Sequence, residues 1–239
     1  MRIFCNGCSY TWGSELKDHK KSRYSTLLGQ MFDAEVVNIA SSGTSLHRLL
    51  RTTYESCDPS KYDLAILQFT CPARTEYFVD GWDEIRERCF MRVRSAPISQ
   101  PLSSRPWTNI PNRQDHIEYQ ESYYRTAFSC EMLQTFEYMV FQGLQDYFAR
   151  HNVPLVMLTI NPNSSLPFDL NLKTDDIPKA SGGHPNELGH RFIAKKLEPI
   201  IKERLDNRVN YVDAKKSHLH RLKQDHEKIL EENRHTDYN

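Results

Sequence analysis

The sequence predicts an α/β domain: a three-layer sandwich in which a central, mostly parallel five-stranded sheet is covered by helices on both faces. In the first half of the chain, apolar segments of strand length alternate with segments of helical spacing, the order typical of parallel sheets. Residues 63–70 form an apolar run without alternation, as expected for a central strand that is buried on both faces.

The expected elements follow one another as strand, helix, strand, helix and strand, and resume after a long interruption. The expected strands are residues 2–5, 35–40, 63–70, 153–160 and a last short one at 210–212. The expected helices are residues 24–32, 46–54, 119–151 and 186–205, with a polar loop at 162–180.

The two long helices each carry apolar residues at helical spacing, which predicts a face packed on the sheet. In the first helix these residues are Phe128, Met132, Phe136, Met139, Val140, Leu144, Tyr147 and Phe148. In the second they are Leu188, Phe192, Ile193, Leu197 and Ile201.

The length of 239 residues suits one sizeable core with extensions. We expect the domain to span residues 1–212, with an insertion rich in proline, serine and arginine around 95–118 that forms either a lid or an added loop. Residues 213–239 are highly charged and are expected to form a helical tail, either solvated or docked on a protein partner or a second copy of the chain.

Composition excludes several classes of function. Lysine plus arginine and aspartate plus glutamate both number 31, so net charge gives no pull toward nucleic acid or a membrane surface. No apolar run approaches the length of a membrane span and no secretory leader is visible, so we expect a cytoplasmic protein whose six cysteines are reduced. The Cys5-x-x-Cys8 spacing has no second pair to complete a metal site, and we expect neither metal nor cofactor.

Candidate reactive residues follow the predicted strands, where parallel sheets form their sites. Ser9 follows the first strand after a glycine-containing turn, and its hydroxyl and N–H can face the same space; its alternative role is a helix N-cap. Gly43 follows the second strand and can bring its N–H close to a ligand. Gln68, Thr70 and Arg74 follow the third strand and can face a site, although Arg74 can instead pair with a local carboxylate.

His184 completes the set of candidates, because it precedes a helix that starts with proline and so stands on a loop with a rigid exit. A base for a serine hydroxyl must lie within hydrogen-bond reach, which a fixed loop supplies. His190, further along the helix, can share the site but is rather expected to be a surface or packing residue. Trp12 can line a substrate cleft but is rather expected to be a packing residue. Trp107, in the proline-rich segment, is the better candidate for a binding aromatic.

Taken together, these segments resemble the conserved blocks of SGNH (GDSL-like) hydrolases. Gly7-Cys8-Ser9-Tyr10 stands where that family has its Gly-Asp-Ser block, residues 38–43 resemble the glycine block, and residues 184–190 resemble the histidine block. The resemblance implies that Ser9 is a nucleophile, that His184 is its base, and that the N–H groups of Ser9 and Gly43 bind the oxyanion.

Two positions depart from the family pattern. The family has asparagine after the third strand, where this chain offers only Gln68 or Thr70 as an oxyanion donor. It also has aspartate three residues before the histidine, where this chain has Ser181. Losing the orienting aspartate of a serine triad costs on the order of 10⁴ in rate. A backbone carbonyl, Asp175 or Asp176 can replace it, and we hypothesise Asp176.

Two functions of different class remain. The first is a serine esterase that removes a small acyl group from a carbohydrate or similar ester, without a cofactor. The second is a catalytically weak or inactive protein of the same fold that binds or assembles, conceivably in a phage virion, since variants with a Gly-Cys-Ser block resemble proteins of tailed phages.

Overall fold

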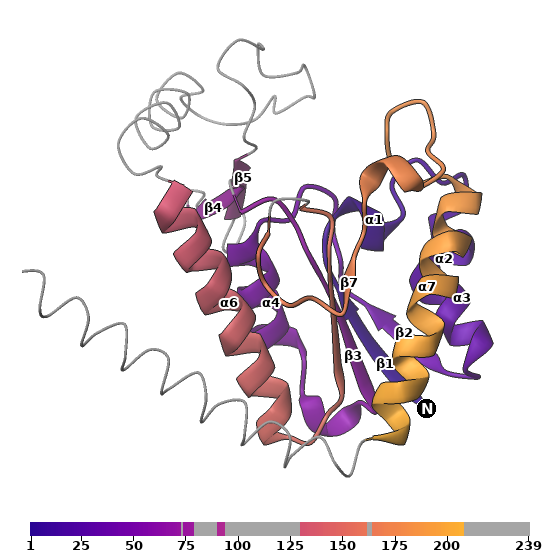
Figure 1. Cartoon of the computed structure of the whole chain (residues 1–239), viewed down its shortest axis with the longest axis horizontal. Coiled ribbons are helices and arrows are strands. Elements are labelled where there is room, and N and C mark those ends of the chain that lie inside the picture. Colours follow the sequence, from indigo (N-terminus) through magenta and orange to yellow (C-terminus); the bar gives the residue numbers. More distant parts are fainter. Residues whose placement is uncertain (73, 79–89, 94–129, 162–163, 208–239) are drawn as a thin grey trace, which may run out of the picture.

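The computed structural model describes the chain except for residues 73, 79–89, 94–129, 162–163 and 208–239. Its main sheet has five strands in the order β2-β1-β3-β6-β7, and every neighbouring pair is parallel (Figure 1). These strands are β1 (Arg2–Asn6), β2 (Glu35–Asn38), β3 (Leu64–Phe69), β6 (Leu155–Thr159) and β7 (Leu170–Asn171). The predicted fold class is confirmed.

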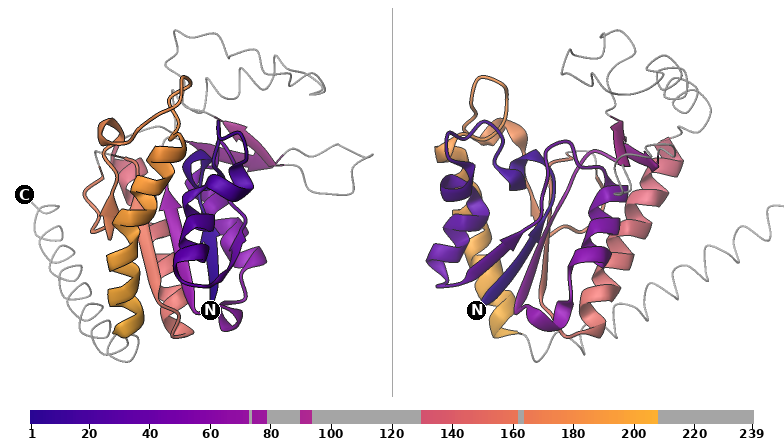
Figure 2. Two further views of the ribbon diagram at one scale, coloured as in Figure 1. Left: turned by 90° about the vertical axis from the view of Figure 1, so that its right-hand side faces the viewer. Right: turned by 180° about the vertical axis from the view of Figure 1, so that it is seen from behind.

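Helices cover both faces of this sheet, and Figure 2 shows the layers from two further sides. The helices are α1 (Ser9–Trp12), α2 (His19–Ser22), α3 (Tyr24–Met31), α4 (Leu46–Ser56), α6 (Cys130–Arg150) and α7 (Glu187–Asp206), with single 3₁₀ turns at Pro59–Lys61 (η1) and Thr174–Asp176 (η2). Helices α3 and α7 share one apolar core with the sheet, and α4 and α6 share the other. Strand β3 supplies both cores, because successive side chains point to opposite faces.

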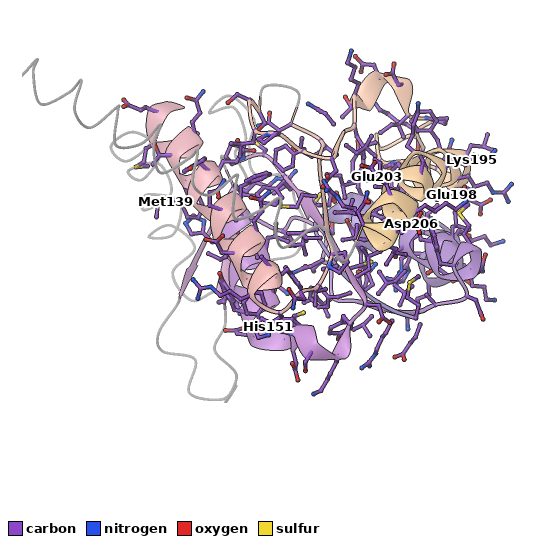
Figure 3. All side chains as sticks on the ribbon, turned by 60° about the horizontal axis from the view of Figure 1, so that its bottom comes forward. Met139, His151, Lys195, Glu198, Glu203 and Asp206 are labelled. Carbon is purple, nitrogen blue, oxygen red and sulfur yellow. The ribbon has the colours of Figure 1, made fainter. Side chains whose placement is uncertain are left out.

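The apolar faces of the long helices differ in part from the expectation. On α6, the buried side chains are Val140, Phe141, Leu144 and Phe148, whereas Met139 is 62% exposed and points away from the sheet (Figure 3). Residues 140, 141, 144 and 148 lie along one side of a helix. Position 139 is rotated by about 100° from position 140, in the direction away from the other three. Met132 on α6 and Leu188 on α7 are likewise exposed, so the predicted stripes were too wide.

Two further differences concern strands. The segment expected to be a polar loop contains β7, which pairs with the end of β6 and completes the five-stranded sheet. A strand of two residues is too short to show periodicity. A separate antiparallel pair, β4 (Thr75–Phe78) with β5 (Phe90–Val93), was not expected.

Several predictions fall on residues outside the described part of the chain. They are the proline-rich insertion around 95–118, Trp107, Phe128, the strand at 210–212 and the tail 213–239. Among the helices that the structure does describe, none combines the length and the apolar character needed to cross a membrane.

Candidate active site

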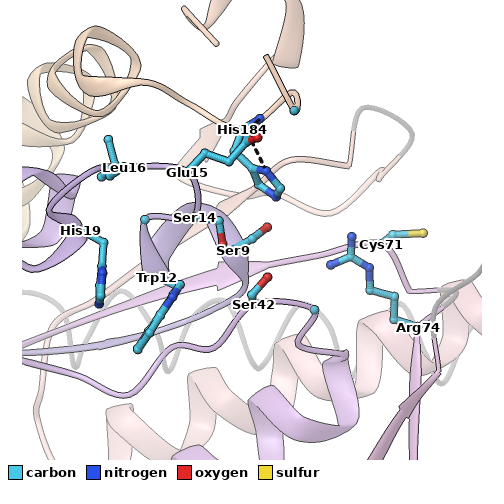
Figure 4. A pocket seen from close by; sticks show the side chains of 13 residues that line it. Ser9, Trp12, Ser14, Glu15, Leu16, His19, Ser42, Cys71, Arg74 and His184 are labelled. Carbon is cyan, nitrogen blue, oxygen red and sulfur yellow. Dashed lines mark hydrogen bonds and ion pairs between the residues drawn. The ribbon is translucent and has the colours of Figure 1, made fainter. Parts of the chain in front are cut away.

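A pocket of about 710 Å³ opens at the carboxyl ends of β1 and β3, beside the loop that precedes α7. It is lined by Ser9, Trp12, Gly13, Ser14, Glu15, Leu16, His19, Ser42, Gly43, Cys71, Arg74, Gly182 and His184 (Figure 4). Four residues selected from the sequence therefore meet in one cavity: Ser9, Gly43, Arg74 and His184. This is the edge of a parallel sheet at which ligand sites form.

Ser9 is held at the start of a short helix directly after β1. It is the first residue of α1 and is 5% exposed, and its hydroxyl donates to Cys8 Sγ over 3.8 Å. As the first helical residue it has no acceptor for its N–H within the helix, which leaves that N–H for a ligand. The expected order of strand, glycine turn, serine and helix is confirmed.

A buried hydrogen-bond network lies beneath this serine turn. The Gln68 side-chain oxygen accepts from the Cys8 N–H at 3.2 Å and from the Thr11 hydroxyl at 2.9 Å, while its amide nitrogen donates to the Phe69 carbonyl at 3.0 Å. Gly7 packs so closely on Gln68 that an added Cβ would lie 2.8 Å from the Gln68 Cβ. Gln68 thus supports the nucleophile turn from below, and it is not among the residues that line the pocket, where an oxyanion donor would stand.

The glycine block adds a second backbone segment beside Ser9. Gly43 has φ of 76°, a left-handed conformation that favours glycine, and it lines the pocket. The Ser45 hydroxyl accepts from the Arg48 N–H at 3.1 Å and caps α4. The Asn38 side chain donates to the Thr11 carbonyl at 2.9 Å and so joins this block to the serine turn.

Arg74 stands across the pocket from Ser9 (Figure 4). Its guanidinium donates to the Thr70 hydroxyl at 2.8 Å. Thr70 itself is 1% exposed and does not line the pocket, so the structure places it as a support for Arg74 rather than at the expected oxyanion position. Among the described residues this is the one bond of the guanidinium, whose other donors suit a ligand with acceptor oxygens.

His184 is contacted by a carboxylate that the sequence reasoning did not select. Glu15 Oε2 lies 3.1 Å from His184 Nδ1 and accepts from the His184 N–H at 2.9 Å (Figure 4). The pKa of the Glu15 carboxyl is lowered, mainly by the His184 N–H that it accepts, so the group stays ionised below its usual range. The His184 ring also contacts the Tyr10 ring in a T-shaped arrangement, with ring centroids 6.1 Å apart.

Asp176, the hypothesised partner of His184, lies elsewhere. It belongs to η2, is exposed and is not among the lining residues. Glu15 escaped selection because it is close to the serine block in sequence and far from the histidine block. Only the fold brings these two segments together.

Trp12 and His190 differ in role. Trp12 lines the pocket and stacks on His19, with centroids 4.6 Å apart, so it is more than the packing residue that was expected. His190 is a packing residue, which was one of its expected roles. It is fully buried, and its Nδ1 accepts from the Tyr24 N–H at 3.1 Å. Burial lowers the pKa of His190 to about 4. Within the described residues, no cluster of three or more histidine, cysteine or acidic side chains is placed to hold a metal.

The Ser9 and His184 side chains share the pocket without a direct hydrogen bond between them in the described structure, where the Ser9 hydroxyl bonds to Cys8. Because Nδ1 of the imidazole faces Glu15, Nε2 is the nitrogen left to act on a serine hydroxyl. Catalytic hydrogen bonds are often long before a substrate is bound. The arrangement can therefore carry acyl transfer once the serine side chain turns toward the ring.

Comparison with known proteins supports the fold. No family model matches this sequence, and no curated protein matches it by sequence. Among solved structures, a carbohydrate esterase described as having divergent catalytic and non-catalytic binding functions superposes with a TM-score of 0.50 at 10% identity, over 84% of this chain and 64% of that one. The esterase EstA from Pseudoalteromonas sp. has a TM-score of 0.48 at 11% identity, over 86% of this chain and 99% of that one.

A protein from Desulfitobacterium hafniense assigned to the lipolytic G-D-S-L family has a TM-score of 0.37 at 12% identity, over 83% of this chain and 98% of that one. The carbohydrate esterase that superposes with a TM-score of 0.50 shares the predicted fold, and the predicted resemblance is confirmed for the fold. What this chain does is a separate question that its own site must answer.

Proposed function

We propose that this chain is a serine ester hydrolase of SGNH type, with Ser9 as nucleophile and His184 as general base. One observation carries the proposal: Ser9 and His184 line the same pocket, and a carboxylate occupies Nδ1 of the imidazole so that Nε2 remains for the serine. A serine hydroxyl is a weak nucleophile unless a neighbouring base takes its proton. The pocket supplies that pair.

The reaction proceeds in two steps. Ser9 Oγ attacks the acyl carbon while His184 takes the hydroxyl proton and passes it to the departing alcohol, leaving an acyl-serine. Water then attacks the acyl-serine, with His184 again taking and returning the proton, and the carboxylic acid leaves. No redox partner or cofactor enters this balance.

The oxyanion is bound by backbone groups in this proposal. The N–H of Ser9 at the start of α1 and the N–H of Gly43 both belong to segments that line the pocket. Gln68 and Thr70 were the other candidates, but both are engaged below the pocket surface. Removing one such donor costs roughly 10²–10³ in rate, so two donors rather than three predict a modest turnover.

We propose a small acyl group on a carbohydrate or a similar polar alcohol as the substrate. Ser14, Ser42 and Arg74 give the lining polar groups, which suits an alcohol with several hydroxyls. A carbohydrate esterase is among the structures that share the fold.

The second candidate function is binding without catalysis. Two observations favour it: the Ser9 hydroxyl is bonded to Cys8 rather than to His184, and the asparagine of the oxyanion hole is missing. The same pocket would then hold an ester or a sugar without cleaving it.

The deciding experiment is hydrolysis of p-nitrophenyl acetate by the purified chain, beside Ser9→Ala and His184→Ala. We expect turnover in the parent protein and its loss to background in both variants. Ser60→Ala is the matched control, since Ser60 is exposed in η1, at the opposite end of β3, and should leave turnover unchanged. Equal rates in all four proteins would sink the esterase proposal and favour the binding function.

A further inference from the structure

We propose that Glu15 is the positioning residue for His184, and that it replaces the aspartate that SGNH hydrolases carry three residues before the histidine. In this chain the acid comes from the segment that carries the nucleophile, whereas the family draws it from the histidine loop. The inference rests on ester hydrolysis at Ser9.

Glu15 holds both the backbone and the ring of His184 with one oxygen. Its Oε2 accepts from the His184 N–H at 2.9 Å and lies 3.1 Å from Nδ1. The first contact fixes where the residue stands, and the second fixes how its ring is turned. Together they place Nδ1 toward the carboxylate, with the proton on that nitrogen, and direct Nε2 away from it.

The charge of Glu15 suits this role as well as its position. Both side chains are about one third exposed, at 29% for Glu15 and 31% for His184. Hydrogen bonds from the backbone of His184, foremost, and of Gly182 lower the pKa of the Glu15 carboxyl and keep it negative. A negative group on Nδ1 stabilises the imidazolium that forms when His184 takes the serine proton.

The backbone around Glu15 is shaped to deliver this contact. Glu15 itself has φ of 69°, an uncommon left-handed conformation for a residue with a side chain. Such a conformation is strained and persists where the surroundings hold it in place, often at functional sites. Two residues earlier, Gly13 also has positive φ, so the chain turns sharply between the nucleophile helix and the acid.

The loop before His184 leaves a space for the Glu15 carboxylate at Gly182, and this space is called the notch below. A Cβ on Gly182 would lie 1.8 Å from Glu15 Oε1, so only glycine leaves room for the carboxylate there. This fit between two segments that are 167 positions apart in sequence is an observation separate from the hydrogen bonds themselves. It indicates that the approach of Glu15 to His184 is built into both segments.

Other acids are placed less well for the role. Asp175 has a side chain that is 98% exposed and pairs with Lys179 at 3.8 Å, and Asp176 is exposed on the same 3₁₀ turn. Ser181, at the family's aspartate position, carries no charge. Among the described residues, Glu15 is the only carboxylate that lines the pocket.

The first test compares Glu15→Gln with Asp176→Asn on p-nitrophenyl acetate. Glutamine keeps the shape and an acceptor oxygen for the His184 N–H but removes the charge. We expect kcat to fall by about 10²–10⁴ with KM changed less than about threefold in Glu15→Gln, and both constants to stay within about twofold in Asp176→Asn. The reverse pattern, or an unchanged kcat in Glu15→Gln, overturns the proposal.

A second readout does not depend on turnover. The proton between His184 Nδ1 and a carboxylate should give a far-downfield proton resonance, which is identified by its loss in His184→Gln. We expect Glu15→Gln to shift this resonance strongly upfield and Asp176→Asn to leave it in place. If the parent protein lacks turnover but shows this pattern, the proposed function fails while the positioning contact stands; a resonance unaffected by Glu15→Gln contradicts the contact.

A third variant tests the notch while keeping the carboxylate in the chain. Gly182→Ala places a methyl group where Glu15 Oε1 now lies and should push the side chain away from His184. We expect a fall in kcat in the same direction as in Glu15→Gln, and no further fall when the two substitutions are combined, because both remove one interaction. Additive losses in the double variant would show that Gly182 acts by another route.

Discussion

The two sides of the pocket are built in different ways. The serine turn rests on buried polar side chains. The Gln68 oxygen accepts from the Cys8 N–H and from the Thr11 hydroxyl, and the Asn6 oxygen accepts from the Gly7 N–H. The loop that carries His184 is largely exposed and is tied to the serine side through Glu15. The comparison teaches that the nucleophile is positioned by the stability of the fold, whereas the base is positioned by a few surface contacts.

The strongest way to break this contrast is Gln68→Leu. It removes the acceptor of two buried donors, the Cys8 N–H and the Thr11 hydroxyl, and each unsatisfied donor costs about 1–3 kcal/mol. We expect the free energy of unfolding, measured with urea, to fall by about 4 kcal/mol. Gln30→Leu is the control for losing a glutamine in general, because Gln30 is exposed on α3. A similar loss in both variants would show that the serine turn has no special support.

A smaller and pH-dependent effect is expected at His190, which anchors the first turn of α7 just after the histidine loop. Its pKa is about 4 in the folded chain, against 6.5 for an ordinary histidine, because burial disfavours the charged ring. The unfolded chain therefore binds the proton first, so the free energy of unfolding should fall as pH drops from about 6.5 to about 4, by about 3 kcal/mol in total.

The check is urea unfolding at several pH values for the parent protein and His190→Asn. Asparagine can accept from the Tyr24 N–H in place of Nδ1 but does not titrate. We expect the variant to lose this part of the pH dependence. An equal slope in both proteins would assign the acid sensitivity to other groups.

The smallest expected effect concerns Arg74, which tests how the pocket wall across from Ser9 contacts the substrate. Only its contact with Thr70 is made in the described structure, so its other donors can meet an anionic group. We expect Arg74→Gln to raise KM for the p-nitrophenyl monoester of succinic acid by about fivefold, equivalent to about 1 kcal/mol, and to leave p-nitrophenyl acetate nearly unchanged. Arg74→Lys keeps the charge as the matched control, and equal effects on both esters would argue against an anion contact.

The sequence by itself determined the fold class and much of the site. The apolar run 63–70 predicted the central strand. The strand ends pointed to Ser9, Gly43 and Arg74, and the loop before the last long helix pointed to His184; the fold brings all four into one pocket. These signals are local, because the residues that form a buried parallel strand and the turn after it are consecutive in the sequence.

The tertiary structure alone decided what depends on distant segments. Gln68 supports the serine turn, β7 is a strand of two residues that exists through its pairing with β6, and Glu15 rather than Asp176 meets His184. No periodicity or spacing marks such partners, because hydrogen bonds and close packing depend on three-dimensional position. The residue opposite Nδ1 is selected by the way β1 and α7 place their flanking loops against one another.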